Sequence, residues 1–422
     1  MRIKKLELKN FRGFEELTID FPEGESGLAV FVGVNGSGKT SVLEGVARSL
    51  KRIVDSLKRD SKDDFDMKLD SSQIRIVPHK LGSKITLERK SEYRVGINAI
   101  INDKEVSWFF TDSGGNDSDI RPKTQQLRKN VSDNGVAILP MIAFYNTKRY
   151  WGTEIIEKSE DIADSSRLTA YDDCLNPKVN TQLLYTWFRR MKLIQLENES
   201  LDLPPELKAV FNAINTAISK LNEISNNNIQ ASYLIKENDL FISLNSEKVM
   251  PFRLLSEGYR CLLGMIADIA YRMAELNPHE RNNTPGIILI DEVDLHLHPK
   301  WQRNVIAALR VIFPNIQFIL TTHSPQVLSN VPRENVFILK DFKLEPNKPH
   351  TEGRDSNAIL EDIFEVPSRP EEEKNELDAL FDAIENGEKE KAQKLYDELK
   401  RKLGDRDLEL QRAENYMDVL ID

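Results

Sequence analysis

The stretch Gly33-Val-Asn-Gly-Ser-Gly-Lys-Thr40 fills every fixed position of the phosphate-binding pattern G-x-x-x-x-G-K-[ST]. The apolar run Leu28–Val32 precedes it and is typical of a buried strand, and residues 41–50 follow with apolar side chains at helical spacing. Strand, glycine loop and helix in this order direct backbone N–H groups and the positive end of a helix dipole at one anion. The sequence therefore predicts a binding site for a nucleoside triphosphate.

The residues of this loop are predicted to contact both the phosphates and a metal ion. Lys39 is expected to reach the β and γ phosphates, and the Thr40 hydroxyl is expected to hold Mg²⁺. The predicted nucleotide contacts in the loop are Asn35, Gly36, Ser37, Gly38, Lys39, Thr40 and Ser41. A chance glycine turn before a helix is the alternative, and the complete motif with both correct flanks disfavours it.

The composition is that of a globular chain with an acidic C-terminal part. Of the 422 residues, 30% are charged and 40% hydrophobic, and the formal net charge is −10. Residues 371–422 hold 17 acidic and 9 basic side chains, a net charge of −8, so the rest of the chain is close to neutral. This balance does not exclude a nucleic-acid partner for the main body, whereas the acidic part would repel one.

The sequence suggests no targeting segment and no membrane span. No run of about 18 uncharged apolar residues occurs, and the N-terminal residues enter directly into a polar and apolar alternation. The two cysteines, Cys174 and Cys261, are far apart and form no metal-binding pair. We therefore expect a cytoplasmic protein in which both thiols are structural.

Hydrophobic patterns predict an α/β fold with a mainly parallel core sheet. Helical patterns separate the apolar strands expected at 28–32, 286–290 and 317–321, and this alternation favours parallel pairing. A further core strand is expected at 137–144, with Pro140 forcing a bulge or an edge position. Strands at 3–11 and 17–21 are expected to form a hairpin at the start of the chain. The segments 74–77, 84–88 and 95–101 are expected to form an antiparallel sheet, as part of an antiparallel β subdomain.

The expected domain organisation is a head with an insertion and a C-terminal extension. The head spans 1–342 and contains an inserted helical lobe at about 160–230. A short β pair is expected after the lobe, at 232–235 and 240–244. Residues 343–422 form an acidic helical extension.

The apolar strand that ends at Ile290 is followed by two acids, Asp291 and Glu292. Asp291 is expected to bind Mg²⁺ through water opposite Thr40, and Glu292 to polarise the water that attacks the γ-phosphate. The alternative is a strand end whose acids are simply solvated. The presence of the glycine loop favours the catalytic interpretation.

Three more segments supply candidate phosphate contacts. Ser256-Glu257-Gly258 opens a helix, where a serine N-cap and free backbone N–H groups make a second anion site. His323 follows a core strand and could reach a γ-phosphate, although a strand-end histidine is more often structural. Asp294 follows Glu292 by two positions and is expected to cross to a neighbouring subunit.

In the order and spacing of these motifs the chain resembles ABC-type ATPases of the SMC/RecF/OLD branch. It is more closely similar to a compact bacterial group that includes the ATPase subunits of the anti-phage Septu and retron systems. The segments that carry the resemblance are Lys9-Asn-Phe-Arg-Gly-Phe14, the phosphate loop, 255–260, Asp291-Glu-Val-Asp-Leu-His-Leu-His-Pro299 and Thr321-Thr-His-Ser-Pro325.

The resemblance implies two heads that sandwich two ATP molecules, with each loop facing Ser256-Glu257-Gly258 of the other head. It further implies that Glu292 is the general base, His323 a γ-phosphate sensor and Arg12 an additional phosphate contact. No clear glutamine loop is present, and Asn146 is the nearest candidate for its residue.

By resemblance, the partners are a second copy of the chain and an effector in trans, a nuclease or toxin, with DNA or RNA considered as the signal. The rival interpretation is a DNA-repair clamp like RecF or SMC, or a nucleotide-switched scaffold that hydrolyses ATP slowly.

Four further clusters could form metal, nuclease or nucleic-acid sites, but a structural role is favoured for each. His296 and His298 could suggest a metal site, but Pro299 after them favours helix capping and packing. Asp405 and Asp407 lie in a helical pattern that indicates a solvated face rather than a nuclease site. The basic and aromatic clusters could hold nucleic acid, but core aromatics with surface arginines are favoured, at 148–151 and 187–192.

Overall fold

The computed structural model forms two compact units, Met1–Arg354 and Asp355–Asp422. The division was expected after 342, but residues 343–354 belong to the first unit. There the Thr351 hydroxyl donates to the carbonyl of Val331, and the Gly353 amide donates to the carbonyl of Ser329. The structure describes residues 1–22, 27–58, 69–81, 84–134, 137–149, 166–176, 181–199, 202–225, 229–244 and 248–420.

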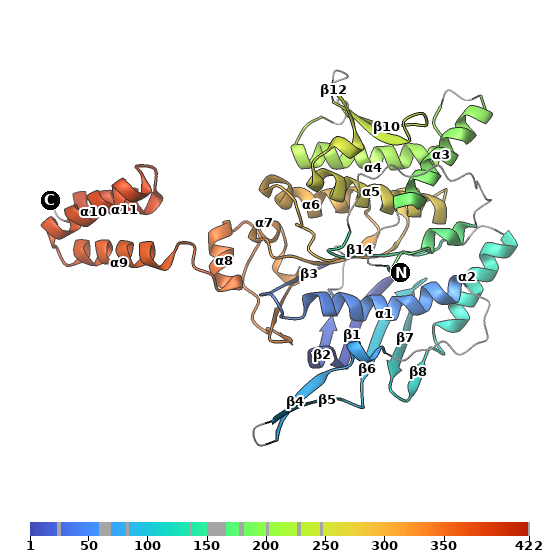
Figure 1. Ribbon diagram of the computed structural model, residues 1–422, viewed down its shortest axis with the longest axis horizontal. Coiled ribbons are helices and arrows are strands. Elements are labelled where there is room, and N and C mark those ends of the chain that lie inside the picture. The colour runs from blue at the N-terminus through green and yellow to red at the C-terminus, as the bar shows by residue number, and fades with distance from the viewer. Residues whose placement is uncertain are drawn as a thin grey trace. The chain divides into compact units, whose positions relative to one another are not determined.

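A six-stranded sheet forms the centre of the first unit (Figure 1). Its strands, in spatial order, are β16 (Lys343–Leu344), β15 (Val336–Lys340), β3 (Leu28–Val32), β14 (Ile316–Thr321), β13 (Gly286–Ile290) and β9 (Met141–Tyr145). All neighbours pair in parallel except β15 and β16. Side chains of β3, β9, β13 and β14 are buried throughout because helices and a second sheet cover both faces. The predicted α/β fold with a mainly parallel core sheet is confirmed.

A second, antiparallel sheet begins the chain. Its strands, in spatial order, are β2 (Phe14–Asp20), β1 (Arg2–Phe11), β6 (Arg94–Ile101), β7 (Lys104–Thr111) and β8 (Gly114–Asn116). Helix α1 (Lys39–Lys58) contacts strands of both sheets, and α2 (Arg121–Asn134) packs on α1. The segments expected at 74–77 and 84–88 do not join this sheet. They form a separate two-stranded hairpin, β4 (Ile76–Leu81) and β5 (Lys84–Arg89).

Pro140 lies just outside its strand, contrary to the expectation that the strand would run through it. Strand β9 begins at Met141, whose amide donates to the carbonyl of Pro285. A proline has no N–H to donate to a ladder, so the strand begins after it. The strand is nevertheless at the edge of the sheet.

The inserted helical lobe contains α3 (Thr181–Glu197) and α4 (Pro205–Asn222). Stacked rings of Phe188, Phe211 and Tyr233 fill the space between these helices and a three-stranded sheet. That sheet consists of the expected pair and one additional strand, β10 (Ile229–Leu234), β11 (Asp239–Leu244) and β12 (Lys248–Pro251). Helix α5 (Glu257–Leu276) joins the lobe to the core because it packs on both α4 and β9.

The remaining helices of the first unit are α6 (Pro299–Ile312) and α7 (Pro325–Leu328). Short 3₁₀ turns lie at Ser71–Gln73, Arg167–Tyr171, Phe252–Leu254, Arg281–Asn283 and Arg333–Asn335. The second unit consists of α8 (Ser356–Phe364), α9 (Glu371–Glu385), α10 (Lys389–Leu403) and α11 (Leu408–Leu420). Helices α9, α10 and α11 enclose a small apolar core that includes Leu380, Tyr396 and Leu410. No helix in the described ranges is long and apolar enough to cross a membrane.

Candidate functional site

A cavity of about 260 Å³ lies where β3, β13 and β14 end. It brings together residues that were predicted from three separate motifs, namely the glycine loop, the paired acids and the strand-end histidine. It also contains one residue, Phe342, that was not predicted. The lining consists of Asn35, Gly36, Gly38, Lys39, Thr40, Ser41, Asp291, Glu292, His323 and Phe342. Because parallel strands all end at one edge of their sheet, segments almost 300 residues apart meet there.

The glycine loop has the backbone conformation that its glycines allow. Gly36 and Gly38 have φ angles of +84° and +104°, and residues with a side chain rarely adopt such angles. A Cβ on Gly38 would also lie 2.6 Å from the Phe14 ring and 2.8 Å from the Phe342 ring. The loop therefore approaches both rings too closely for any residue other than glycine at position 38. Ser37 is buried and is not among the residues that line the cavity.

Lys39 lies beneath this loop. Its side chain is almost fully buried, and Nζ donates to the carbonyls of Gly33 at 2.9 Å and Val34 at 3.0 Å. Burial lowers the pKa of the ammonium, and the carboxylates of Asp291 and Glu292 act in the opposite direction. Lys39 is the first residue of α1, at the positive end of the helix dipole, so a bound anion would stabilise the charge of the ammonium.

Asp291 is the centre of a hydrogen-bond network that joins the glycine loop to the core sheet. Its carboxylate accepts from the Thr40 hydroxyl at 2.9 Å and from the Thr321 hydroxyl at 2.6 Å. The Thr321 oxygen in turn accepts from the amide of Glu292 at 2.7 Å. A buried carboxylate beside a threonine hydroxyl is a set of hard oxygen donors, which fits a magnesium ion.

Glu292 lies at the cavity in a strained backbone conformation, with φ +48°. A non-glycine residue in this region costs about 1–3 kcal/mol and persists only where its surroundings hold it. Burial raises the pKa of its carboxyl group, and the negative charges of Asp291 and Asp294 raise it further. These effects bring the pKa of the Glu292 carboxyl group closer to neutrality, where a general base works best.

Arg149 holds the backbone of both acids and was not singled out by the sequence. Its side chain is only 3% exposed. Nη1 donates to the Asp291 carbonyl at 2.5 Å, and Nη2 donates to the Glu292 carbonyl at 2.6 Å. Nη1 also donates to the carbonyl of Asn146, at the end of β9, at 3.0 Å. One guanidinium thus ties two strand ends together.

This arrangement corrects the interpretation of the cluster 148–151 as containing surface arginines. Arg149 is buried because three carbonyls converge on it, and a sequence pattern cannot reveal such convergence. Tyr150 and Trp151 lie outside the described residues. In the other cluster, Trp187, Phe188 and Met191 are buried, as the core interpretation requires.

His323 and Asp294 lie close to the same charges. Burial lowers the pKa of the imidazole of His323, and the positive charge of Lys39 lowers it further, so the neutral ring is favoured near pH 7. Asp294 accepts a hydrogen bond from the Thr322 hydroxyl at 2.5 Å. Within one chain, therefore, Asp294 already has a partner from the segment that carries His323.

Seven predicted residues do not line the cavity. Two of them, Ser37 and Asp294, are described above, and the other five are Arg12, Asn146, Ser256, Glu257 and Gly258. Arg12 forms an ion pair with Glu44 of α1, at 2.6 Å between Nη2 and Oε2. The Asn146 side chain accepts from the amide of Lys148 at 2.8 Å, which closes a local turn.

The segment Ser256-Glu257-Gly258 begins α5, as predicted. Ser256 is exposed, and its side chain makes no capping hydrogen bond. A Cβ on Gly258 would lie 2.3 Å from the carbonyl of His296, so only glycine allows this close approach of two backbone segments. The exposed start of α5, whose first N–H groups have no partner within the helix, therefore lies outside the lining of the cavity of its own chain.

The weaker metal and nuclease patterns have structural roles. His298 is the N-cap of α6, and its Nδ1 accepts from the amide of Lys300 at 3.3 Å. Asp407 pairs with Arg369 at 2.8 Å and accepts from the amide of Glu409 at 3.0 Å, at the start of α11. No group of three or more His, Cys, Asp and Glu side chains in the described part of the chain could hold a metal ion.

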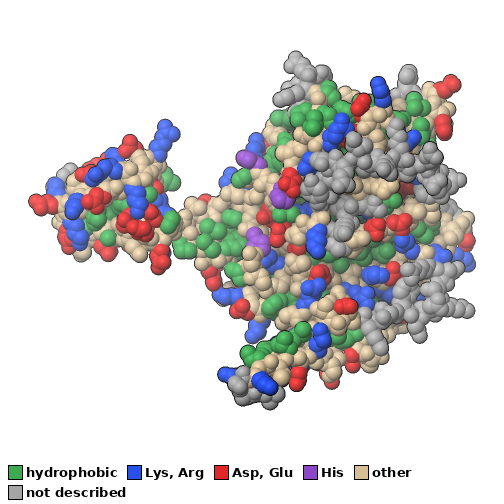
Figure 2. Space-filling model, in the orientation of Figure 1, with side chains coloured by type: hydrophobic (Ala, Val, Ile, Leu, Met, Phe, Trp, Pro, Cys, Tyr) green, Lys and Arg blue, Asp and Glu red, His purple; other side chains and the backbone are tan. Residues whose placement is uncertain are grey.

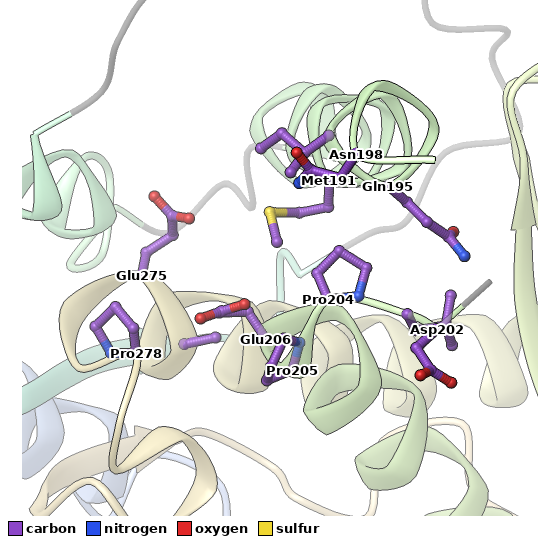
Figure 3. A pocket seen from close by; sticks show the side chains of 12 residues that line it. Met191, Gln195, Asn198, Asp202, Pro204, Pro205, Glu206, Glu275 and Pro278 are labelled. Atoms are coloured by element: carbon purple, nitrogen blue, oxygen red, sulfur yellow. The ribbon is translucent and has the colours of Figure 1, made fainter. Parts of the chain in front are cut away.

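A second hollow, of about 660 Å³, lies in the helical lobe beside α3 and the end of α5 (Figure 3). It shares no residue with the nucleotide cavity. Its lining is Met191, Ile194, Gln195, Asn198, Asp202, Leu203, Pro204, Pro205, Glu206, Ala274, Glu275 and Pro278. Glu275 is already bound there, because it accepts from Trp187 Nε1 and Arg190 Nη2, both at 2.5 Å.

Comparisons with known proteins place the chain in a family. Residues 28–329 match the family model described as "AAA domain, putative AbiEii toxin, Type IV TA system". The chain is 28% identical to the "Retron Ec83 probable ATPase" of Escherichia coli, over 89% of this chain and 78% of that protein. It is 27% identical to the "Septu protein PtuA" of Bacillus mycoides, over 80% of this chain and 40% of that protein.

Among solved structures, the Smc head domain bound to the C-terminal domain of ScpA, derived from Pyrococcus furiosus, is 16% identical. That match covers 83% of this chain and 96% of the other, with a TM-score of 0.46. The family match and the relatives confirm the resemblance drawn from the motifs. The chain belongs to the family of AAA domains described as "putative AbiEii toxin, Type IV TA system", and it is a nucleotide-binding ATPase.

Proposed function

We propose that this ATPase closes as a dimer around two ATP molecules and that the closed state regulates a partner effector. The observation that carries the proposal is the start of α5. Ser256 and Glu257 are exposed there, the Ser256 hydroxyl makes no capping bond, and neither residue lines the cavity of its own chain. A helix N-terminus with free N–H groups is suited to a phosphate, and a second copy would bring that phosphate to it.

In this proposal the residues of one cavity have separate roles. Lys39 and the loop amides bind the phosphates, and Thr40 and Asp291 hold Mg²⁺. When bound, Mg²⁺ would neutralise charge on the phosphates. Glu292 accepts a proton from the attacking water, and His323 contacts the γ-phosphate.

The second copy of the chain would supply the remaining contacts. Ser256, Glu257 and Gly258 bind the γ-phosphate held by the first copy, and Asp294 faces the same interface. To contact a phosphate, the Arg12 side chain would have to leave its ion pair with Glu44 and bind a phosphate oxygen instead. Asn146 stays the nearest candidate for the residue of a glutamine loop.

The effector is proposed from the relatives. Their names place them in retron and Septu systems, and both are anti-phage systems in the resemblance described above. We infer a nuclease or toxin in trans as the regulated partner, with DNA or RNA as the signal. ATP then acts as the ligand that sets the dimer state to which the effector responds.

Ser256→Arg tests the dimer. A long cation at this exposed position would block the second phosphate site, so ATP-dependent dimerisation should be lost while a fluorescent ATP analogue still binds with wild-type affinity. Light scattering after size exclusion, with and without ATP and Mg²⁺, measures the first property. Ser118→Arg, at another exposed serine far along the chain, is the matched control and should dimerise normally.

The same variants test the effector. The co-expressed product of an adjacent gene should co-purify in an ATP-dependent manner with the wild type and with Ser118→Arg. With Ser256→Arg, which cannot close as a dimer, adding ATP should not change the amount that co-purifies. A Ser256→Arg protein that still forms ATP-dependent dimers would refute the proposed role of α5.

The acid limb of the pH profile should report Glu292. A base must be ionised, and the pKa of Glu292 is raised by burial and by Asp291 and Asp294. Turnover should therefore fall with decreasing pH at a higher pH than an ordinary glutamate would give. Asp294→Asn removes one of the charges that raise this pKa but keeps an oxygen for the Thr322 hydroxyl, so the limb should move to lower pH. Steady-state turnover between pH 4.5 and about 8 measures it, and an unmoved limb would contradict the assignment.

A further inference from the structure

The hairpin of β4 and β5 differs from every other strand pair in the described part of the chain, because both of its strands pair only with each other. Figure 1 shows it projecting from the first unit beyond β1 and β6. A two-stranded hairpin has no sheet or helix to bury a hydrophobic face and is of marginal stability by itself. Its side chains should therefore be polar unless another molecule covers them.

One face of this hairpin is apolar and exposed. Paired residues lie on the same face, and Pro78 pairs with Leu87 and Lys80 with Ile85. The side chains of Ile85 and Leu87 are each 70% exposed. Ile76, which pairs with Arg89 on this face, is 43% exposed. These are large apolar side chains in water, and such surfaces commonly mark interaction sites.

The hairpin is also strongly basic, in a chain whose net charge is −10. Residues 75–90 contain five lysines and arginines and one glutamate, a net charge of +4. Arg75 pairs with Glu15, and Arg89 donates to the carbonyl of Ser71. The other three are exposed and form no ion pair with any residue that the structure describes, namely Lys80, Lys84 and Lys90. Figure 2 shows green and blue side chains together on this projection.

The base of the hairpin is fixed to the body of the first unit. The amide of Arg12 donates to the carbonyl of Gln73 at 2.7 Å, and the amide of Arg75 donates to the carbonyl of Asn10 at 3.0 Å. The Arg12 side chain is the partner of Glu44 on α1, the helix that begins at the phosphate loop. The hairpin therefore has a defined position next to the nucleotide-binding part of the first unit.

We propose that the β4–β5 hairpin is a DNA-binding arm. Lys80, Lys84 and Lys90 contact phosphates, and the face with Ile85 and Leu87 rests against a groove of the duplex. A two-stranded β ribbon has the width of the major groove, and arms that enter the minor groove place apolar side chains against the bases. A protein partner would also cover the apolar face, but the charge of the hairpin favours a polyanion.

This proposal gives a surface to the nucleic-acid signal of the proposed function. It is tested without ATP, so its failure leaves the dimer and its catalytic residues untouched. The central experiment is the triple substitution Lys80→Ala, Lys84→Ala, Lys90→Ala in the full chain. Fluorescence anisotropy with a labelled duplex of about 30 base pairs, three helical turns, measures binding over a series of salt concentrations.

Removal of three phosphate contacts should weaken binding at least about 30-fold at 0.1 M salt and reduce the slope of log K against log salt by about 3. The matched control is Lys374→Ala, Lys391→Ala, Lys394→Ala, which removes three exposed lysines of the second unit. This control should bind as the wild type does. Equal losses in both triple variants, or no binding of DNA by the wild type, would overturn the proposal.

Ile85→Ser with Leu87→Ser distinguishes DNA from a protein partner. If the apolar face rests on a duplex, this variant binds DNA at least about 3-fold more weakly, keeps the salt slope and elutes in size exclusion as the wild type does. If the face binds a second copy or another protein, DNA binding is unchanged and the elution volume shifts, and the proposal is wrong. Both variants change exposed residues, so an unchanged melting temperature verifies their folding.

Discussion

Glu292→Gln is expected to lower steady-state ATP turnover by about 10²–10⁴-fold while nucleotide binding is retained. The amide has the shape of the carboxylate but cannot take a proton from water. The contacts that would bind the phosphates remain, because Lys39, Thr40 and the loop glycines are unchanged. Bound ATP should therefore accumulate, and in the proposed sandwich it should stabilise the dimer.

Two measurements separate binding from chemistry in this variant. Phosphate release at saturating ATP reports turnover, and light scattering after size exclusion reports the dimer. Glu280→Gln makes the same chemical change at an exposed position and should leave both unchanged. Wild-type turnover in Glu292→Gln would remove Glu292 from the role of base, and loss of nucleotide binding would indicate that the residue is structural.

Arg149→Ala should be the most destabilising of the substitutions considered. It removes a buried cation from three carbonyls, those of Asn146, Asp291 and Glu292. Buried acceptors that lose their donor cost about 1–3 kcal/mol each. We expect the free energy of unfolding of the first unit to fall by about 3–5 kcal/mol, because the penalties of the three carbonyls add only in part.

Arg149→Lys separates charge from geometry. An ammonium keeps the positive charge but lacks the planar fork that reaches two carbonyls at once. This variant should leave the unit folded but release the strained backbone at Glu292, so turnover should fall more than nucleotide affinity does. Calorimetry and turnover measured on Arg149→Ala, Arg149→Lys and the exposed control Arg310→Ala test this. A melting temperature and turnover of Arg149→Ala equal to those of the control would contradict the assigned position.

Much of the core could be predicted because its signals are local. The run Leu28–Val32 and the glycine loop are contiguous, and a strand, a tight turn and a helix start follow from residues a few positions apart. Strand β13 and its two acids have the same property. The strand expected at 137–144 begins only at Met141, because Pro140 has no N–H for the ladder and the Met141 amide donates to the carbonyl of Pro285, far along the chain.

The arrangement of the strands into sheets was harder to predict. The segments 74–77 and 84–88 have the alternation of a half-buried sheet, but they pair only with each other, and the strand at 95–101 pairs with β1 instead. Alternation shows that a segment is extended and that it has two faces. It does not show which other segment covers them.

By itself, the sequence determined the α/β fold, the phosphate loop, the paired acids and the start of α5, since each of these is encoded by neighbouring residues. Only the tertiary structure decided that Thr40, Asp291 and Thr321 share one hydrogen-bond network and that Arg149, 142 residues before Asp291, supports it. It also decided that Ser256 lies outside the cavity of its own chain. The physical reason is that such contacts form between segments far apart in sequence, and their geometry depends on how the whole sheet is assembled.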